Sequence, residues 1–280
     1  MIMEKIGFVG AGSMAEAIVA GLIKGNVFKA EQIIVSNRSN SERLNELSSK
    51  YGIETTHDKQ KLVREASIVV LAMKPKDVKA GLEGVQHLIH DQVIVSVLAG
   101  ISIHTITNIL GKEAAIVRAM PNTSAAILKS ATAIAGSKNV TSSQMNKCKT
   151  LFEAIGICKI VEENQLDAVT GLSGSGPAYI YYLVEAMEKA AVEVGLDPFV
   201  ARDLIVQTLL GASEMIALSD KHPSQLRKEV TSPNGTTEAG ITILKEKQVE
   251  EAFISCIKRA TERSEELKTM FSEELITFKK

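Results

Sequence analysis

Three small residues near the start of the chain have the spacing of a turn that binds the phosphates of a dinucleotide. Gly10, Gly12 and Ala15 lie between the apolar run Ile6–Val9 and the helix-like stretch Glu16–Ile23. In such a turn the first glycine permits a tight bend, the second lets a pyrophosphate approach the backbone, and the third small residue lets the helix pack on the strand. The free N–H groups of the helix then face the phosphates. The pattern predicts a dinucleotide site, with a purely structural glycine-rich turn as the alternative.

The next strand ends in residues that favour one dinucleotide over the other. An enzyme that prefers NADH usually has a carboxylate here, which binds the ribose 2′-hydroxyl. This chain has Asn37, Arg38 and Ser39 instead. No carboxylate repels a 2′-phosphate, and Arg38 can bind it while the other two side chains donate hydrogen bonds. We therefore expect NADPH as the cofactor and NADH as a weaker alternative; Arg38 as an ordinary solvated charge is the other interpretation.

Later strand ends should line the same crevice, because ligands of open α/β sheets bind at the carboxyl ends of the strands. Ala72, Met73 and Lys74 follow one apolar run, and Ala99 follows the next. Met120–Thr123 follows a third run. We expect Lys74 to position the cofactor or its own loop rather than to take part in the chemistry.

Two segments interrupt the apolar second half of the chain. Gly171–Tyr179 is rich in small residues, which lets the backbone approach either another helix or a nicotinamide ring. Val230–Gly240 is a hydroxyl-rich loop before a helical stretch, and its unpaired N–H groups can bind a small carboxylate. Ser232, Thr236 and Thr237 supply hydroxyls there. A cluster of helix N-cap residues is the alternative, because Ser and Thr are preferred at that position.

The elements that position these residues differ between the two halves of the chain. Residues 5–162 alternate short β-branched runs with helical stretches, as in a doubly wound sheet covered on both faces. The strand runs end before Asn164, and the rest of the chain has helical character. The predicted strands are Ile6–Val9, Ile33–Val35, Ile68–Leu71, Val93–Val97, Ala115–Val117, Ala131–Ile134 and Cys158–Val161, and the predicted long helices of the second half are Pro177–Val194, Pro198–Leu218 and Val249–Phe271.

The predicted fold class is an α/β Rossmann-type doubly wound sheet followed by an all-α C-terminal domain. We assign residues 1–162 to the dinucleotide-binding domain and residues 163–280 to a helical domain for substrate binding and dimerisation. A helix that is apolar on more than one face needs partners on several sides. Because the helical half is too apolar to stand alone, we expect it to share its core with a second subunit.

Composition argues against several classes of function. The formal net charge is −1, without the basic excess of a protein that binds nucleic acid through its phosphates. No apolar run approaches the roughly 20 residues needed to cross a membrane, and the N-terminus lacks the parts of a signal peptide. The three cysteines have no metal-ligand spacing. We therefore expect a cytoplasmic protein with reduced thiols and no metal site.

Five segments resemble the pyrroline-5-carboxylate reductases, and the resemblance covers essentially the whole chain. They are Gly7–Gly12, Lys74–Pro75, Arg118–Thr123, Asp167–Tyr179 and Thr231–Thr237. The last two together are highly specific to that family. The resemblance implies NADPH-dependent reduction of 1-pyrroline-5-carboxylate to L-proline, the final step of proline biosynthesis, by direct hydride transfer to the cyclic imine.

The resemblance also implies roles for individual residues. Thr237, the expected catalytic residue, would hydrogen-bond the ring nitrogen and orient the imine without being an essential proton donor. Ser232 and Thr236 would bind the substrate with it, and Glu163 would lie at the edge of the substrate pocket. Members of the family form homodimers through interlocked C-terminal helices, often assembled into decamers of five dimers. The residues expected to bind the cofactor are Val9, Gly10, Ala11, Gly12, Ser13, Met14, Asn37, Arg38, Ser39, Ala72, Met73, Lys74 and Ala99.

Two positions depart from the pattern of the family. Asn234 replaces the first glycine of the usual Ser-Pro-Gly-Gly loop, and Asn tolerates the left-handed conformation that a glycine would adopt. Lys59 stands where many relatives carry Asn near the cofactor. It either approaches the 2′-phosphate or lies in solvent.

Three other functions are alternatives. A β-hydroxyacid dehydrogenase also joins a Rossmann domain to a helical one, but the positions of its catalytic Lys and Asn are Ile180 and Val184 here, both inert. A non-catalytic regulator would bind NADPH and reduce no imine; the intact hydroxyls of the Val230–Gly240 loop argue against it. A paralogue specialised for a related cyclic imine remains open.

Overall fold

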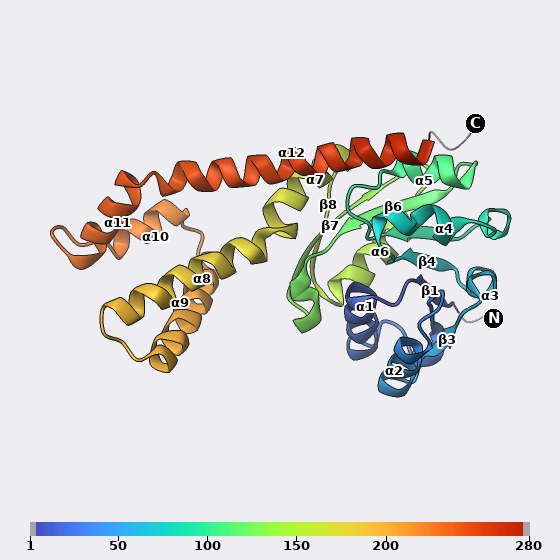
Figure 1. The fold of residues 1–280 in the computed structure, drawn as a ribbon, viewed down its shortest axis with the longest axis horizontal. Coiled ribbons are helices and arrows are strands. Elements are labelled where there is room, and N and C mark those ends of the chain that lie inside the picture. The colour runs from blue at the N-terminus through green and yellow to red at the C-terminus, as the bar shows by residue number, and fades with distance from the viewer. Residues whose placement is uncertain (1–3, 277–280) are drawn as a thin grey trace. The chain divides into compact units, whose positions relative to one another are not determined.

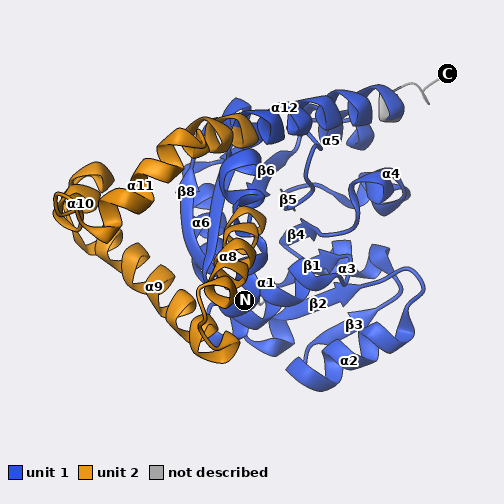
Figure 2. Ribbon diagram, turned by 60° about the vertical axis from the view of Figure 1, so that its left-hand side comes forward, with its two compact units in different colours: residues 1–177, 258–280 blue, residues 178–257 orange. Residues whose placement is uncertain are grey.

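The protein is described from a computed structural model, which defines residues 4–276. The chain forms two compact units: one extends to Pro177 and resumes at Lys258, and the other is Ala178–Ile257 (Figure 2). The sheet belongs to the first unit, and the second consists of helices and their loops. The predicted boundary after residue 162 falls inside the first unit, because residues 163–177 and the end of the last helix pack with the sheet. As a functional division, that boundary stays a prediction.

The first unit is built on an eight-stranded sheet (Figure 1). The strand order is β3-β2-β1-β4-β5-β6-β7-β8, and neighbours are parallel except β6 and β7. The connections reverse direction at β1 and β4, so ligands are expected beyond the carboxyl ends of these two strands. The strands are β1 Ile6–Val9, β2 Ile33–Ser36, β3 Glu54–Thr56, β4 Ile68–Leu71, β5 Val93–Ser96, β6 Ala115–Met120, β7 Ser130–Gly136 and β8 Gly156–Ile160.

Helices pack on the sheet and make up the second unit. Those within the first unit are α1 Ser13–Lys24, α2 Ser41–Tyr51, α3 Lys59–Glu65, α4 Val78–Leu82, α5 Ile103–Leu110, α6 Ser142–Glu153 and α7 Leu166–Val169. The remaining helices are α8 Gly176–Glu193, α9 Pro198–Leu218, α10 Pro223–Glu229, α11 Thr236–Glu246 and α12 Val249–Ile276. The first residues of α8 and the larger part of α12 belong to the first unit.

Successive side chains of the central strands enter two separate cores. Phe8 and Val70 belong to the core that includes residues of α1, α2 and α6, whereas Val9 and Leu71 belong to the core that includes residues of α3, α4 and α5. All four side chains are buried. A strand covered on both faces is apolar at nearly every position, which explains the near-continuous apolar runs of the sequence.

The fold class predicted from the sequence is confirmed, and all seven predicted strands are present. The eighth strand, β3, was not predicted because it is a three-residue segment of polar side chains at the edge of the sheet. The antiparallel pairing of β7 with β6 was also not predicted, since the runs give no direction. In the second half, α9 has the predicted bounds: Pro198 occupies its first turn and the Asp197 side chain accepts hydrogen bonds from the N–H groups of Phe199 and Val200.

Candidate active site

The glycine-rich turn lies where the chain leaves β1, between the ends of β2 and β4. The N–H of Gly10 donates to the Ser36 carbonyl oxygen at 2.9 Å, and the N–H of Ala72 donates to the Val9 carbonyl oxygen at 2.9 Å. Gly10 has φ of +114°, and a Cβ added to it would lie 2.5 Å from the Ala72 carbonyl oxygen. The first glycine is therefore required both by its backbone conformation and by the backbone of the neighbouring strand end.

The second glycine begins α1 and leaves the helix N-terminus open. Gly12 is the N-cap residue, has extended backbone angles, and provides no side chain to cap the first N–H groups. Its added Cβ would meet only the Ala72 carbonyl oxygen, at 3.9 Å. Ser13 is exposed, whereas Ala11 is buried and Met14 packs against the core. The exposed N–H groups fit the predicted binding of pyrophosphate.

A cluster of charged side chains that sequence analysis missed supports this turn. The Arg43 side chain donates from Nε to the Ala11 carbonyl oxygen at 2.9 Å and forms an ion pair with Glu16. Lys50 and Tyr51 each lie 2.9 Å from Glu16 Oε1. Hydrogen bonds from Lys50 and then Arg43 lower the pKa of the Glu16 carboxyl to about 2. The spacing of residues in the sequence does not predict this cluster, because its members come from two different helices, α1 and α2.

The end of β2 borders a cavity of about 380 Å³ that includes several predicted cofactor residues. Val9, Gly10, Asn37, Arg38 and Met73 line it. The other residues that line it are Ser36, His57, Lys59, Asp77, Ala80 and Gly81. Of these, only Lys59 is named in the sequence analysis, as a residue that either approaches the 2′-phosphate or lies in solvent. Because the cavity extends from the turn of β1 to the end of β2, it has the position expected for the adenosine ribose of a dinucleotide.

Asn37 has a structural task in addition to the predicted one. Its side-chain Oδ1 accepts hydrogen bonds from the N–H groups of Ser39, at 3.1 Å, and Asn40, at 2.9 Å. Asn37 therefore shapes the turn after β2 and also lines the cavity, whereas Ser39 does not line it. The predicted hydrogen bonds of both side chains to the cofactor stay predictions. Arg38 is exposed at the cavity and remains the predicted partner of the 2′-phosphate.

The ends of β4 and β5 carry the other residues predicted to bind the cofactor. Ala72 is buried beside the glycine-rich turn, and Lys74 is exposed directly before a 3₁₀ turn at Pro75–Asp77. Ala99 is half-buried in the loop after β5. The next residue, Gly100, has φ of +73°, and its added Cβ would lie 3.2 Å from the Phe271 ring of α12.

Glu163 connects three elements of the first unit. Its Oε1 accepts hydrogen bonds from the N–H of Ile103 at the start of α5, at 2.8 Å, and from the buried Arg118 guanidinium of β6, at 3.0 Å. Through these contacts Glu163 caps the N-terminus of α5 and balances the charge of Arg118. Its predicted place at the edge of the substrate pocket stays a prediction.

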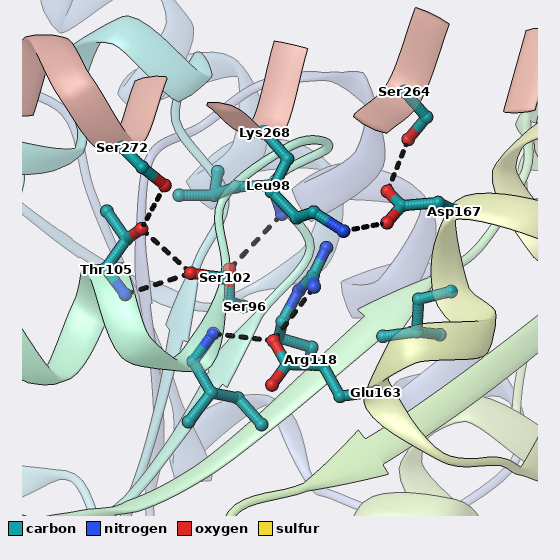
Figure 3. A network of polar contacts seen from close by, with 12 residues as sticks. Ser96, Leu98, Ser102, Thr105, Arg118, Glu163, Asp167, Ser264, Lys268 and Ser272 are labelled. Atoms are coloured by element: carbon teal, nitrogen blue, oxygen red, sulfur yellow. Dashed lines mark hydrogen bonds and ion pairs between the residues drawn. The ribbon is translucent and has the colours of Figure 1, made fainter. Parts of the chain in front are cut away.

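The end of α12 is held on the first unit by polar contacts (Figure 3). The Asp167 carboxylate is 2% exposed, accepts a hydrogen bond from Ser264 at 2.8 Å and pairs with Lys268. Ser272, one turn further, lies 3.1 Å from the Thr105 hydroxyl of α5. Asp167 begins one of the segments on which the family resemblance rests. These contacts explain it as an anchor for α12 rather than as a reacting group.

The hydroxyl-rich loop of the second unit forms the turn before α11. Asn234 has φ of +59°, so the left-handed conformation expected at this departure from the family pattern is confirmed. Its N–H donates to the Glu238 carboxylate at 2.7 Å, and Gly235 is the N-cap of α11. Thr236 and Thr237 form the exposed first turn of that helix, where N–H groups have no intrahelical acceptor. Ser232 is exposed in the same turn.

The small-residue segment before α8 packs closely within the first unit. Residues Thr170–Gly174 form one π-helical turn. A Cβ added to Gly174 would lie 2.7 Å from Met120 Cε, and the Asn122 side chain donates to the Ser173 carbonyl oxygen at 3.0 Å. Of the two interpretations left open for this segment, these contacts support close packing.

Two further findings concern the described residues. Among residues 4–276, no group of three or more His, Cys, Asp or Glu side chains is arranged to hold a metal ion. In the same range, no helix combines the length and apolar character that membrane crossing requires.

Two segments of the chain match known families. Residues 5–100 match the family described as NADP oxidoreductase, coenzyme F420-dependent. Residues 163–267 match the family described as pyrroline-5-carboxylate reductase dimerisation.

Individual proteins match over nearly the full length. The chain is 48% identical to pyrroline-5-carboxylate reductase 2 of Bacillus subtilis (strain 168), over 96% of this chain and 97% of the relative. Among solved structures, a pyrroline-5-carboxylate reductase from Coxiella burnetii has a TM-score of 0.88 and 37% identity, and covers 94% of this chain and 98% of its own. A Plasmodium falciparum pyrroline carboxylate reductase with NADP bound has a TM-score of 0.87 and 27% identity, covering 96% and 99%.

Proposed function

Because the chain belongs to the pyrroline-5-carboxylate reductase family, we propose that it reduces 1-pyrroline-5-carboxylate to L-proline with NADPH, the final step of proline biosynthesis. The observation that carries the proposal is the similarity to reductases of this name, which extends through both compact units. The protein is an NADP-dependent oxidoreductase, and NADH is expected to be the weaker cofactor.

The residues of the first unit fit the cofactor. Gly10 and Gly12 place no side chain between the backbone and a ligand at the start of α1, and the cavity that Gly10 lines is also lined by Arg38. When bound, NADPH supplies the hydride for C5 of the imine. The turn from Val9 to Met14 would hold the pyrophosphate, Arg38 the 2′-phosphate, and Ala72 to Lys74 with Ala99 the nicotinamide side.

The loop of the second unit would bind and orient the imine. The exposed N–H groups at the start of α11 attract a carboxylate, and the hydroxyls of Ser232 and Thr236 lie in the same turn. Thr237 would hydrogen-bond the ring nitrogen and so fix which carbon faces the hydride. Because a protonated imine is already electrophilic, correct positioning supplies most of the rate enhancement, up to about 7–11 kcal/mol in favourable cases.

The helices of the second unit support dimerisation. Large apolar side chains of α8 and α9 are exposed in the single chain: Tyr182 by 74%, Phe199 by 83% and Leu218 by 87%. Exposed apolar surface of this kind marks an interface between proteins. We therefore propose a homodimer through the C-terminal helices, with a decamer of five dimers as the larger assembly and the cytoplasm as its location.

Two alternatives predict different behaviour. An alcohol-oxidising dehydrogenase needs proton-transfer groups where Ile180 and Val184 stand in α8. A non-catalytic regulator would bind NADPH without turnover of any imine.

Thr237→Ala tests the catalytic assignment, with Thr237→Ser as the matched variant that keeps the hydroxyl. Loss of one hydrogen bond to a charged group costs about 1.5–3 kcal/mol, so kcat/KM of Thr237→Ala should fall at least about tenfold. The Ser variant should stay within about threefold of the parent, and the Kd for NADPH should not change in either. Unchanged kcat/KM in Thr237→Ala contradicts the assignment.

A further inference from the structure

The cavity at the end of β2 has an excess of groups that can carry positive charge. Among the described residues that line it, Arg38, His57 and Lys59 are basic and Asp77 is acidic. A 2′-phosphate is a dianion that binds best where charged N–H donors converge. The three basic groups differ in how free they are to serve as such donors.

His57 is occupied by the turn that it supports. Its Nδ1 lies 2.7 Å from the Asn37 carbonyl oxygen, and its Nε2 lies 3.0 Å from the Ser41 hydroxyl. A carbonyl oxygen only accepts, so Nδ1 must carry the hydrogen, and Nε2 can accept from Ser41. Both ring nitrogens are therefore engaged by the protein, which makes His57 a wall of the cavity rather than a partner for an anion.

Lys59 is held at the cavity by a hydrogen bond to a backbone carbonyl. It is the first residue of α3, whose start is fixed by the Asp58 side chain, an acceptor for the N–H groups of Gln60 and Lys61. The Lys59 ammonium donates to the Ala80 carbonyl oxygen of α4 at 2.6 Å. That acceptor is neutral. A phosphate in the cavity therefore offers a stronger acceptor than the one the ammonium now has.

We propose that Lys59 determines the preference for NADPH together with Arg38. When the 2′-phosphate enters the cavity, the Lys59 ammonium exchanges the Ala80 carbonyl for a phosphate oxygen, while Arg38 binds the phosphate as well. The inference rests on the proposed NADPH dependence, and it deepens it by assigning discrimination to two cations on different elements.

The test measures binding to the free enzyme, by calorimetry, of NADP⁺, NAD⁺ and adenosine 2′,5′-bisphosphate. Lys59→Met should weaken NADP⁺ and the bisphosphate about tenfold, as expected for the loss of one charged contact, and leave NAD⁺ within about twofold. Lys59→Arg should restore most of the difference. Lys76→Met, an exposed lysine outside the cavity, is the matched control and should change none of the three affinities.

Two outcomes overturn the inference. Unchanged NADP⁺ affinity in Lys59→Met shows that the ammonium stays on Ala80 or in solvent. Equal weakening of NADP⁺ and NAD⁺ shows that Lys59 acts only by holding α4 in place. Both readouts are independent of imine reduction, so failure of the proposed reaction and failure of this inference are separately visible.

Discussion

Alanine should change a different property at each of the two glycines of the nucleotide turn. Gly10→Ala should destabilise the fold, whereas Gly12→Ala should weaken NADPH binding. At Gly10, an alanine must adopt φ of +114° and place its Cβ 2.5 Å from the Ala72 carbonyl oxygen and 2.6 Å from the carbonyl carbon. The backbone conformation alone costs on the order of 1–3 kcal/mol. Because the obstructing atoms are backbone beside a buried strand end, they cannot move aside cheaply. We expect Gly10→Ala to lower the free energy of unfolding by at least about 3 kcal/mol.

At Gly12 the same methyl group meets almost no protein. The residue has φ of −76° and ψ of 179°, which any amino acid adopts, and the nearest atom to its added Cβ is 3.9 Å away. Loss of a glycine N-cap and gain from a stiffer unfolded chain are each about 1 kcal/mol and of opposite sign. The methyl group would instead occupy the space through which the pyrophosphate approaches. Gly12→Ala should therefore fold normally and bind NADPH at least about tenfold more weakly.

Urea unfolding at matched protein concentration and titration of NADPH fluorescence separate the two effects. The chain contains no Trp, so protein emission interferes little with the fluorescence of the reduced cofactor. Normal stability of Gly10→Ala, or normal NADPH affinity of Gly12→Ala, would refute the assignment of this turn.

Three further predictions concern buried and charged side chains. Lys268→Met leaves the Asp167 carboxylate without its cation and should lower the free energy of unfolding by about 2–4 kcal/mol, measured by urea unfolding. The pKa of Glu16 is about 2 in the fold against an ordinary 4.5, so its stabilising contribution is complete above about pH 4.5 and lost as pH falls toward 2. Glu16→Gln should flatten this acid limb by about 1–2 kcal/mol, after allowance for solvent around its partners. Burial raises the pKa of Cys148 and Cys158 to about 12, so neither thiol should react with iodoacetamide in the folded protein at about pH 8.

Each of these predictions has a control within the chain. Lys258→Met removes an exposed lysine of α12 and should change stability by less than about 0.5 kcal/mol. Glu46→Gln removes the other carboxylate bound to Arg43 and should leave the acid limb in place. Both buried cysteines should label once urea unfolds the protein. Equal midpoints for the two lysine variants, identical acid limbs for the two glutamate variants, or rapid labelling of folded Cys148 would each contradict the corresponding reasoning.

The sequence predicts those strands in which burial on both faces restricts nearly every position to an apolar residue. β1, β2, β4 and β5 are covered on both faces, so each appears as an apolar run. β3 has an edge position and polar, half-buried side chains, so hydrophobicity carries no signal for it. The direction of β7 is set by its pairing with β6 in the tertiary structure, so the local sequence does not reveal it.

The site divides in the same way. Gly10 is predictable because a neighbouring backbone leaves no room for a side chain, and Gly12 because the proposed pyrophosphate would occupy the space that a side chain needs. Arg43 is not, since its contacts with Ala11 and Glu16 join residues far apart in the chain. The hydrogen bonds that Asn37 accepts from the following N–H groups are not predictable either, because they depend on the local turn.

The most direct test of the account is a rate measurement with the purified protein. Oxidation of NADPH is followed with 1-pyrroline-5-carboxylate, and in parallel with NADH and with the six-membered imine piperideine-2-carboxylate. The account predicts fastest turnover with the five-membered imine and NADPH, and formation of L-proline in equal amount. Tight binding of NADPH without reduction of either imine would contradict it and favour the non-catalytic regulator.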